Sequence, residues 1–344
     1  MGVLEENIKI LLMKMEITQW KTPKLNPSFF EHQIITREDL RKINDLTGAY
    51  FTSKTSGSTG EPVIVSKTMD DYIWFVASNI RDIRWRKWDV TKNVAHIKTT
   101  ATESTYNGWG IPTNIEPIQG ITYTNNYKPI SELQEWLEKV NPHYINCFPS
   151  IFKLLDTSRI TNFIDWKGTG EVGGRLYSSE ECGVIALECP DNPKMMHVME
   201  NQYVERDVDG GLIISTLTNK YVRRYKHGDH IELGKCTCGR GLQTITEIKG
   251  RVRNMFVLPN GDKKWPLIGS LEFHSEYGIK RYKAIQHTIE ELELQIVSEP
   301  LNDKEEELKS LVKKWIDSPI NVTITYVDSF PNYKFEEFVC LVEN

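Results

Sequence analysis

Amphipathic patterns along the chain predict helices set between short apolar strands. Residues 4–15 and 37–44 carry hydrophobic side chains at helical spacing, and Thr36 precedes the second stretch as its N-cap. A further amphipathic stretch covers residues 131–140. We expect that helix to end at Asn141-Pro142, because the residue before a proline disfavours helical geometry.

Short apolar runs bounded by turn residues predict strands. These runs cover residues 49–54, 62–66 and 144–148. Pro149-Ser150 opens another predicted helix, over residues 151–155. Strands and helices that alternate in this way are typical of a layered α/β core.

The C-terminal region has a different pattern. Residues 283–289 and 291–297 alternate like the two strands of a hairpin. A charged amphipathic helix is predicted over residues 303–315, and Thr, Val and Ile alternate over residues 321–327 as a third strand. Together these segments predict a compact β-β-α-β unit.

A chain of 344 residues is long for one domain. We therefore expect a large N-terminal domain over residues 1–250 and a small C-terminal domain over residues 251–344. Gly250–Asn254 is the predicted hinge between them.

The composition excludes several classes of function. Hydrophobic residues make up 39% and charged residues 26% of the chain, as in ordinary soluble proteins. The net charge of −5 gives no basic field for a phosphate backbone, so no nucleic-acid partner is expected. No apolar stretch reaches membrane-spanning length, and residues 1–26 lack the apolar core of a signal peptide. Six cysteines are too few for a disulfide scaffold, which favours a reduced, cytoplasmic setting.

The most informative segment is Thr55–Pro62, whose first six positions hold four hydroxyl side chains and two glycines. Glycines let backbone N–H groups turn inward around an anion, and hydroxyls add donors toward phosphate oxygens. No Gly-Lys-Ser/Thr follows, and the next predicted element is a strand, so this is not the nucleotide loop of P-loop NTPases. From composition alone, a surface turn would be the favoured interpretation.

Thr55–Pro62 resembles the phosphate loop of the adenylate-forming superfamily, which includes acyl-CoA synthetases, peptide-synthetase adenylation domains and luciferases. Within the superfamily, the chain most resembles the phenylacetate–CoA ligase branch. Further segments resemble family motifs in the expected order. They are Phe148-Pro149-Ser150, Gly170-Glu171, Tyr177–Gly183 running on to Ile185-Ala186, Arg224–Asp229 and Gly250-Arg251. Their common order makes the resemblance far more specific than any single match.

This resemblance implies an α/β protein with the adenylate-forming enzyme fold, in which the small C-terminal domain acts as a lid. It implies an acid–AMP ligase of the acid–thiol type, which uses ATP to convert a carboxylic acid into an acyl-adenylate and releases pyrophosphate. The N-terminal half is shorter than in typical members of the branch. That difference leaves open the shape of the acid pocket and the oligomeric state, a homodimer included.

The family's functional residues can be carried over onto matching positions. The phosphates of ATP would be held by Thr55, Ser56, Gly57, Ser58, Thr59 and Gly60, with Thr59 also counted as catalytic. Glu171 and Tyr177 would lie at the adenine, where the tyrosine offers a flat face. Asp229 would accept hydrogen bonds from both ribose hydroxyls. Arg251 would add positive charge near the ribose and phosphates.

Glu181 would bind Mg²⁺, a hard cation that takes carboxylate and phosphate oxygens together. Glu180 beside it makes the register ambiguous, and we favour Glu181 because the rest of the motif follows it in register. Lys334 resembles the catalytic lysine of the C-terminal lid, although an exposed terminal lysine is the alternative interpretation. Trp109 lies where the branch places acid-binding residues, although a core tryptophan would give the same pattern.

Two positions depart from the family's pattern. Val63 stands where many members have a lysine after the loop proline, so one phosphate contact is absent or supplied elsewhere. Arg253-Asn254 stands where an Asp-Asp pair often follows the hinge arginine.

A cysteine and histidine constellation is the second chemical signal. Cys189 and His197 are followed, after a gap, by Cys236 and Cys238, and Gly239 completes a tight turn. Two thiolates one residue apart suit a tetrahedral ion when two more nitrogen or sulfur ligands arrive from elsewhere. The phenylacetate–CoA ligase branch often carries such a cluster, which favours structural Zn²⁺ over unrelated buried thiols. The remaining cysteines near apolar strands, Cys147 and Cys340, are expected in the core.

The acceptor of the acyl group stays open at this point. The resemblance implies an aryl or heteroaryl acid, whose adenylate would pass to the thiol of CoA or of an acyl carrier protein. One alternative is an enzyme that passes the acyl group to an amine or retains the adenylate. Another is a catalytically weak protein that binds a nucleotide or adenylate.

Overall fold

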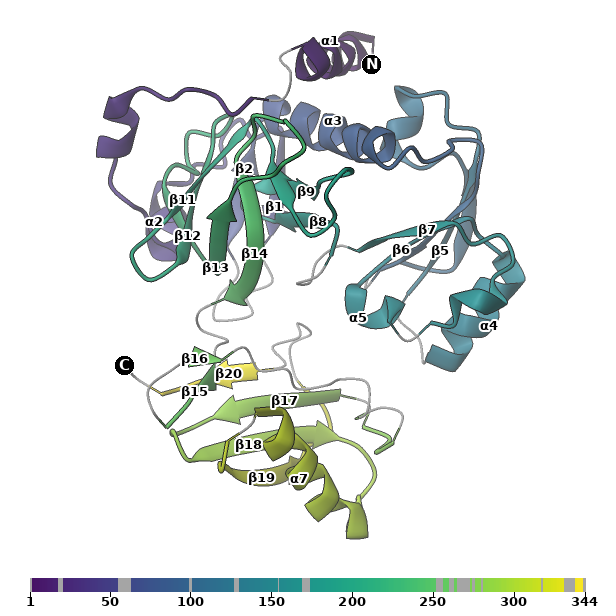
Figure 1. Cartoon of the computed structure of the whole chain (residues 1–344), viewed down its shortest axis with the longest axis vertical. Helices are drawn as coiled ribbons and strands as arrows, with labels where there is room; N and C mark the ends of the chain where they lie inside the picture. The colour runs from purple at the N-terminus through teal and green to yellow at the C-terminus, as the bar shows by residue number, and fades with distance from the viewer. Residues whose placement is uncertain are drawn as a thin grey trace. The chain divides into compact units, whose positions relative to one another are not determined.

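The chain folds into two compact units in the computed structural model (Figure 1). The model describes residues 2–17, 21–54, 63–98, 101–126, 130–153, 155–168, 174–251, 256–259, 263–264, 273, 276–279, 281–316, 318–330 and 338–342. The first unit consists of Met1–Thr55, Ile64–His227 and Ile231–Ile248, and the second of Ser56–Val63, Gly228–His230 and Lys249–Asn344. Among the described residues, no helix is both long enough and apolar enough to cross a membrane.

The two N-terminal helices expected from the sequence are confirmed as α1 (Gly2–Ile17) and α2 (Arg37–Ile43), with the short 3₁₀ turn η1 (Pro27–Glu31) between them. Thr36 caps α2 as predicted: its hydroxyl accepts from the backbone N–H of Asp39, whose carboxylate accepts from the backbone N–H of Thr36. This reciprocal capping box satisfies two donors that the helix itself leaves unpaired.

The first unit also contains a long helix that the sequence analysis did not anticipate, α3 (Met69–Trp85). One face of α3 packs against α1. That contact is formed by Ile8, Leu12 and Met15 of α1 and by Ile73, Val76, Ala77 and Ile80 of α3. Asp71, Arg81 and Asp82 of α3 are buried as well. α3 therefore carries an apolar stripe, and buried charged residues lie beside it.

A five-stranded sheet in the first unit has the order β4-β5-β3-β6-β7. Its strands are β3 (Val94–Ile97), β4 (Ser104–Asn107), β5 (Ile121–Asn125), β6 (Tyr144–Cys147) and β7 (Asp165–Gly168). β5, β3, β6 and β7 are parallel, and β4 runs antiparallel on the edge. The predicted strand over 144–148 is thereby confirmed as β6.

One face of this sheet is apolar and is covered by α4 (Ile130–Val140), the amphipathic helix predicted over 131–140 (Figure 1). Leu133, Trp136 and Leu137 of the helix pack with buried strand residues that include the predicted core cysteine Cys147. The loops at the sheet edges contain η2 (Ile111–Asn114), α5 (Pro149–Phe152) and η3 (Thr157–Arg159). The helix opened by Pro149 therefore ends earlier than the predicted residues 151–155.

A seven-stranded sheet has the order β11-β12-β13-β14-β10-β9-β8. Its strands are β8 (Leu176–Ser179), β9 (Gly183–Glu188), β10 (Met196–Val198), β11 (Gln202–Arg206), β12 (Gly211–Thr216), β13 (Tyr225–Gly234) and β14 (Thr244–Arg251). A separate antiparallel pair, β1 (Phe51–Lys54) and β2 (Ile64–Lys67), flanks the segment Thr55–Pro62, which lies outside the described residues. The pair confirms the strands predicted on either side of that segment.

The second unit contains a four-stranded sheet of order β19-β18-β17-β20 and a two-stranded one. The strands are β15 (Phe256–Val257), β16 (Lys263–Lys264), β17 (Arg281–Gln286), β18 (Glu291–Val297), β19 (Asn321–Tyr326) and β20 (Phe338–Cys340), and η5 (Asn302–Lys304) leads into α7 (Glu305–Ile316). The predicted hairpin is confirmed as β17 and β18, and α7 packs on the sheet as the predicted helix. β20 pairs parallel with β17, and Cys340 lies partly buried against this core. The boundary at residues 250 and 251 stays a prediction.

Buried charges on α3 join it to both sheets of the first unit. Asp82, which is 2% exposed, accepts from Arg86 one turn later at 2.9 Å and from Lys167 of β7 at 2.9 Å. Arg81 forms a bidentate pair with Glu200, with distances of 2.6 and 2.8 Å. A buried ion is tolerated only where its partners remain in place, so these contacts constrain the position of α3.

We predict that Asp82→Asn lowers the free energy of unfolding by about 3 kcal/mol, because it leaves the buried Lys167 without its carboxylate and weakens the pairing of Arg86. Urea denaturation followed by tryptophan fluorescence measures the change. Glu138→Gln is the matched control, since Glu138 pairs with an exposed Arg159 at 2.8 Å and its loss should cost less than about 1 kcal/mol. Equal destabilisation by the two substitutions would contradict this assignment.

Candidate functional site

Glu181 lies in the turn that connects β8 and β9, and its side chain is buried, with 2% of its surface exposed. The next strand begins at Gly183, whose φ of 76° is accessible to glycine at little cost. The backbone N–H of Cys182 donates to the hydroxyl of Ser179 at 3.2 Å and narrows the turn. Glu180, the alternative metal ligand, is exposed.

Three strands hold this turn in place. The hydroxyl of Tyr225 on β13 donates to Oε1 of Glu181 at 3.2 Å. Nζ of Lys67 on β2 donates to the backbone carbonyl of Glu181 at 2.6 Å, and the hydroxyl of Ser53 on β1 donates to that of Glu180 at 2.7 Å. The hairpin that carries the predicted phosphate loop is thus bonded on both of its strands to the turn of the predicted metal ligand.

Burial sets the protonation of the groups around Glu181. Burial, followed by the neighbouring Glu181 charge, raises the pKa of Tyr225, so its hydroxyl stays protonated and remains a donor. Burial also raises the pKa of Cys182 to about 12, which keeps this thiol protonated. Burial lowers the pKa of Lys67, although nearby acidic groups oppose the shift. Among the described residues, no donor reaches Oε2 of Glu181, so that oxygen is available to a cation.

The sequence analysis did not predict that Lys67 and Ser53 hold the turn. Both side chains donate to backbone carbonyls, and every residue has such a carbonyl, so the sequence does not identify the acceptor. Asp71 and Asn219 support the same region. Asn219 donates to the backbone carbonyl of Ser66 at 2.8 Å and to Asp71 at 2.9 Å. A lysine at the end of the strand that follows the predicted phosphate loop is a signal that could have directed attention there.

Tyr177 lies on β8, partly buried, and is linked to Glu181 through aromatic neighbours. Its ring meets that of His227 edge-on at 6.1 Å, and His227 meets Tyr225 in the same way at 6.1 Å. The structure therefore brings the predicted adenine-binding tyrosine and the predicted Mg²⁺ ligand into one connected set of side chains.

The remaining predicted nucleotide ligands are placed only in part. Asp229 lies on β13 with 8% of its surface exposed and belongs to the second compact unit, so its relation to Glu181 stays a prediction. Arg251 is the last residue of β14. The segment Thr55–Gly60, Glu171 and Lys334 lie outside the described residues. Val63, at the departure from the family's lysine, is buried.

Trp109, the predicted wall of the acid pocket, packs in an apolar cluster with Val94, Ile118 and Tyr144. Its indole N–H donates to the backbone carbonyl of Lys92 at 3.0 Å, and its ring meets that of Tyr144 edge-on at 5.7 Å. These contacts involve the first residues of β3 and β6. The role of Trp109 in binding the acid stays a prediction.

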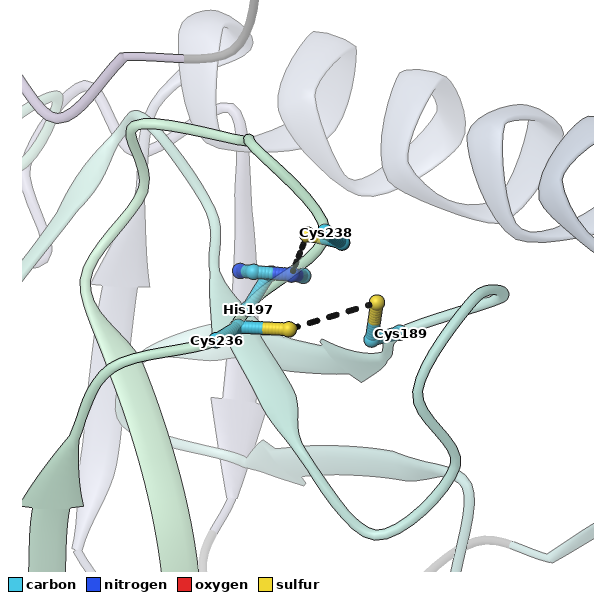
Figure 2. Close-up of side chains that lie close together, drawn as sticks. All are labelled: Cys189, His197, Cys236 and Cys238. Carbon is cyan, nitrogen blue, oxygen red and sulfur yellow. Dashed lines mark hydrogen bonds between the residues drawn. The ribbon is translucent and has the colours of Figure 1, made fainter.

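The four predicted zinc ligands converge in the first unit (Figure 2). Cys189 directly follows β9, His197 lies on β10, and Cys236 and Cys238 lie in the turn after β13, where Gly239 has a φ of 85°. One ligand atom from each residue lies within 4.8 Å of the others. Cys189 and His197 are fully buried.

The distances within this cluster fit a tetrahedral ion. Sγ of Cys236 lies 3.7 Å from Sγ of Cys189, and Nε2 of His197 lies 3.2 Å from Sγ of Cys238. Zinc–sulfur bonds of about 2.3 Å in a tetrahedron imply sulfur–sulfur edges of about 3.8 Å. Burial, followed by the charges of Arg240 and Arg81, lowers the pKa of His197 to about 4, so the imidazole is neutral, as a ligand must be.

The fold is similar to that of several solved CoA ligases. The structure of 2-hydroxyisobutyryl-CoA ligase in the postadenylation state, in complex with 2-HIB-AMP, matches with a TM-score of 0.62 at 15% identity, over 92% of this chain and 83% of that chain. The same ligase with 2-HIB-AMP and CoA in the thioesterification state matches with a TM-score of 0.53 at 16% identity, over 99% and 90%. The anthranilate CoA ligase AuaEII in complex with anthranoyl-AMP matches with a TM-score of 0.54 at 11% identity, over 82% and 63%. No family model and no curated protein sequence matches the chain.

We propose that the cluster binds one structural zinc ion per chain, with all four positions filled by protein ligands. Metal analysis of protein prepared without chelators should find zinc in stoichiometric amount. Cys236→Ser should lose the metal and lower the melting temperature, because metal binding in such sites contributes to folding. Cys340→Ser, in the second unit, is the matched control and should retain it. Less than about a tenth of an equivalent in the unmodified protein would refute the assignment.

Proposed function

We propose that this protein activates a carboxylic acid with ATP, forming an acyl-adenylate and pyrophosphate, and then transfers the acyl group to the thiol of CoA. The observation that carries the proposal is the buried Glu181 carboxylate, fixed by Tyr225 and bonded through its backbone to the hairpin of the predicted phosphate loop. The fold supports it, since solved structures of the same fold are CoA ligases in complex with acyl adenylates.

In the proposed reaction, a carboxylate oxygen of the acid attacks the α-phosphorus of ATP, and the bond from that phosphorus to the pyrophosphate oxygen breaks. Backbone and hydroxyl groups of Thr55–Gly60 bind the phosphates. Glu181 holds Mg²⁺, which offsets negative charge on the phosphate oxygens when bound. Asp229 binds the ribose hydroxyls, and Arg251 lies near the phosphates. Tyr177 and Glu171 lie beside the adenine.

The proposal also names the class of acid substrate and the acceptor of the acyl group. An aryl or heteroaryl acid is what the resemblance to the phenylacetate–CoA ligase branch implies, and the low number of cysteines favours a cytoplasmic setting. CoA is the favoured acceptor because one of the similar ligases is in complex with CoA. An acyl carrier protein or an amine would be distinguished by measuring pyrophosphate release with a panel of acids, then thioester formation with and without CoA. Pyrophosphate release without any transfer would indicate an enzyme that retains the adenylate.

We predict that Glu181→Gln abolishes nearly all acid-dependent ATP–pyrophosphate exchange while the protein stays folded, because the carboxylate that binds Mg²⁺ is lost. Glu180→Gln is the matched control: this neighbour is exposed, and its substitution should leave exchange near the unmodified rate. Loss of exchange in Glu180→Gln with retention in Glu181→Gln would place the metal ligand one residue earlier.

We also predict that Lys334→Ala slows adenylate formation severely while transfer from pre-made adenylate is largely spared. An ammonium on a flexible stem can neutralise charge as the carboxylate and α-phosphate approach, and rotation of the C-terminal domain would supply it for that step only. Lys314→Ala, on the exposed side of α7, should change neither half-reaction. Single-turnover assays of the two steps make the measurement, and equal slowing of both would count against this role.

A further inference from the structure

The carboxyl ends of β3 and β6 form the topological switch point of the five-stranded sheet. After β3 the chain continues to β4 and β5 on one side of the sheet, and after β6 it continues to β7 on the other side. Open parallel sheets bind their ligands outside the carboxyl ends of strands at such a point. The side chains at this point are therefore candidates for contact with a substrate.

A polar row crosses the sheet at this point. His96 of β3 is the register partner of Asn146 on β6, and Asn146 is the partner of Lys167 on β7. The neighbouring positions Ala95 and Ile145 face the opposite side, in the apolar cluster under α4. A row of polar side chains on a parallel sheet is unusual, because both faces of such sheets are normally apolar.

The hydrogen bond between His96 and Asn146 fixes where the imidazole proton lies. Nδ2 of Asn146 lies 3.0 Å from Nδ1 of His96. An amide nitrogen can only donate, so Nδ1 is the acceptor and Nε2 carries the proton. Burial, followed by the charges of Lys98 and Lys167, lowers the pKa of His96 to about 3, so the ring stays neutral at pH 7. His96 thus offers one N–H donor, at Nε2.

The two lysines near His96 have different surroundings. Nζ of Lys167 donates to Asp82 at 2.9 Å and to Asn79 at 3.3 Å, so its charge is already balanced. Lys98 directly follows β3, and its backbone N–H donates to the carbonyl of Asn125 at 3.0 Å, which keeps it beside β5. Within the described part of the chain, no carboxylate pairs with Lys98.

Lys98 is accessible to solvent, yet it is not an ordinary surface lysine. Its side chain is exposed. Burial by surrounding protein, followed by the charge of Lys167, nevertheless lowers its pKa. An ammonium with no carboxylate partner among the described residues, held at the carboxyl end of β3, attracts an anion.

We propose that Lys98, with the Nε2–H of His96, binds a second anionic group on the acid substrate, so that the preferred substrate is a dicarboxylic acid. This inference rests on the proposed adenylation activity and adds its substrate class. One carboxylate of the substrate would react with ATP, and the other would accept hydrogen bonds from the ammonium and the imidazole. Asn146 acts as a positioning residue, because it determines which imidazole nitrogen carries the proton.

ATP–pyrophosphate exchange with paired acids tests the proposal. Each pair has similar size and differs in one carboxylate: glutarate against pentanoate, and isophthalate against benzoate. We expect a diacid to exceed its monoacid partner by at least about 10-fold in kcat/KM, since a hydrogen bond to a charged group has that magnitude. Lys98→Met should reduce the diacid value by about 10- to 100-fold and leave the monoacid value within about twofold. Lys98→Arg should retain the preference.

Lys139→Met is the matched control, because Lys139 is exposed on α4, which covers the opposite face of the sheet. It should leave both values unchanged. Exchange that favours the monoacids, or a preference that Lys98→Met leaves unchanged, would overturn this proposal while the adenylation activity stands. The absence of exchange with any acid, including a broad panel of monoacids, would overturn the adenylation activity and with it the assignment of the diacid.

Discussion

The buried carboxylate of Asp82 is the constraint on which the first unit depends. It pairs with Arg86, which directly follows the same helix, and with Lys167 on β7, while Arg86 also lies 3.5 Å from Glu188 of β9. One helix is thereby joined to both sheets through charges that lose their balance if the elements separate. The same carboxylate pairs with Lys167 at the switch point of the five-stranded sheet, whereas no carboxylate among the described residues pairs with Lys98.

The elements around Glu181 show how a predicted metal ligand is positioned with few contacts to its own side chain. Only the hydroxyl of Tyr225 reaches its carboxylate among the described residues, and the rest of the support comes through the backbone of the turn. This arrangement leaves carboxylate oxygen available for a cation. It also places the hairpin strands β1 and β2 in direct contact with the turn, although they are far from it in sequence.

Local signals made part of the structure predictable. Thr36 and Asp39 follow a capping pattern, and apolar and polar residues alternate along the β17–β18 hairpin. The spacing of the Cys and His residues predicted a cluster of possible metal ligands, and the structure brings these side chains together. α3 was missed although its apolar residues recur at helical spacing, because buried charged residues such as Asp71 and Asp82 lie among them. The position of Lys98 and His96 at the switch point was not predicted, because it follows from the strand order, which no local sequence pattern contains.

The bonds from Lys67 and Ser53 to the carbonyls of residues 181 and 180 have a consequence for how this site can diverge. Every amino acid supplies the same backbone carbonyl, so the anchor does not depend on which side chains occupy the turn. The turn can therefore exchange its side chains during evolution and keep its place beside the hairpin. The position of the turn therefore does not depend on Glu181 remaining at this place: a descendant that replaced the predicted metal ligand would keep the turn bonded to β1 and β2.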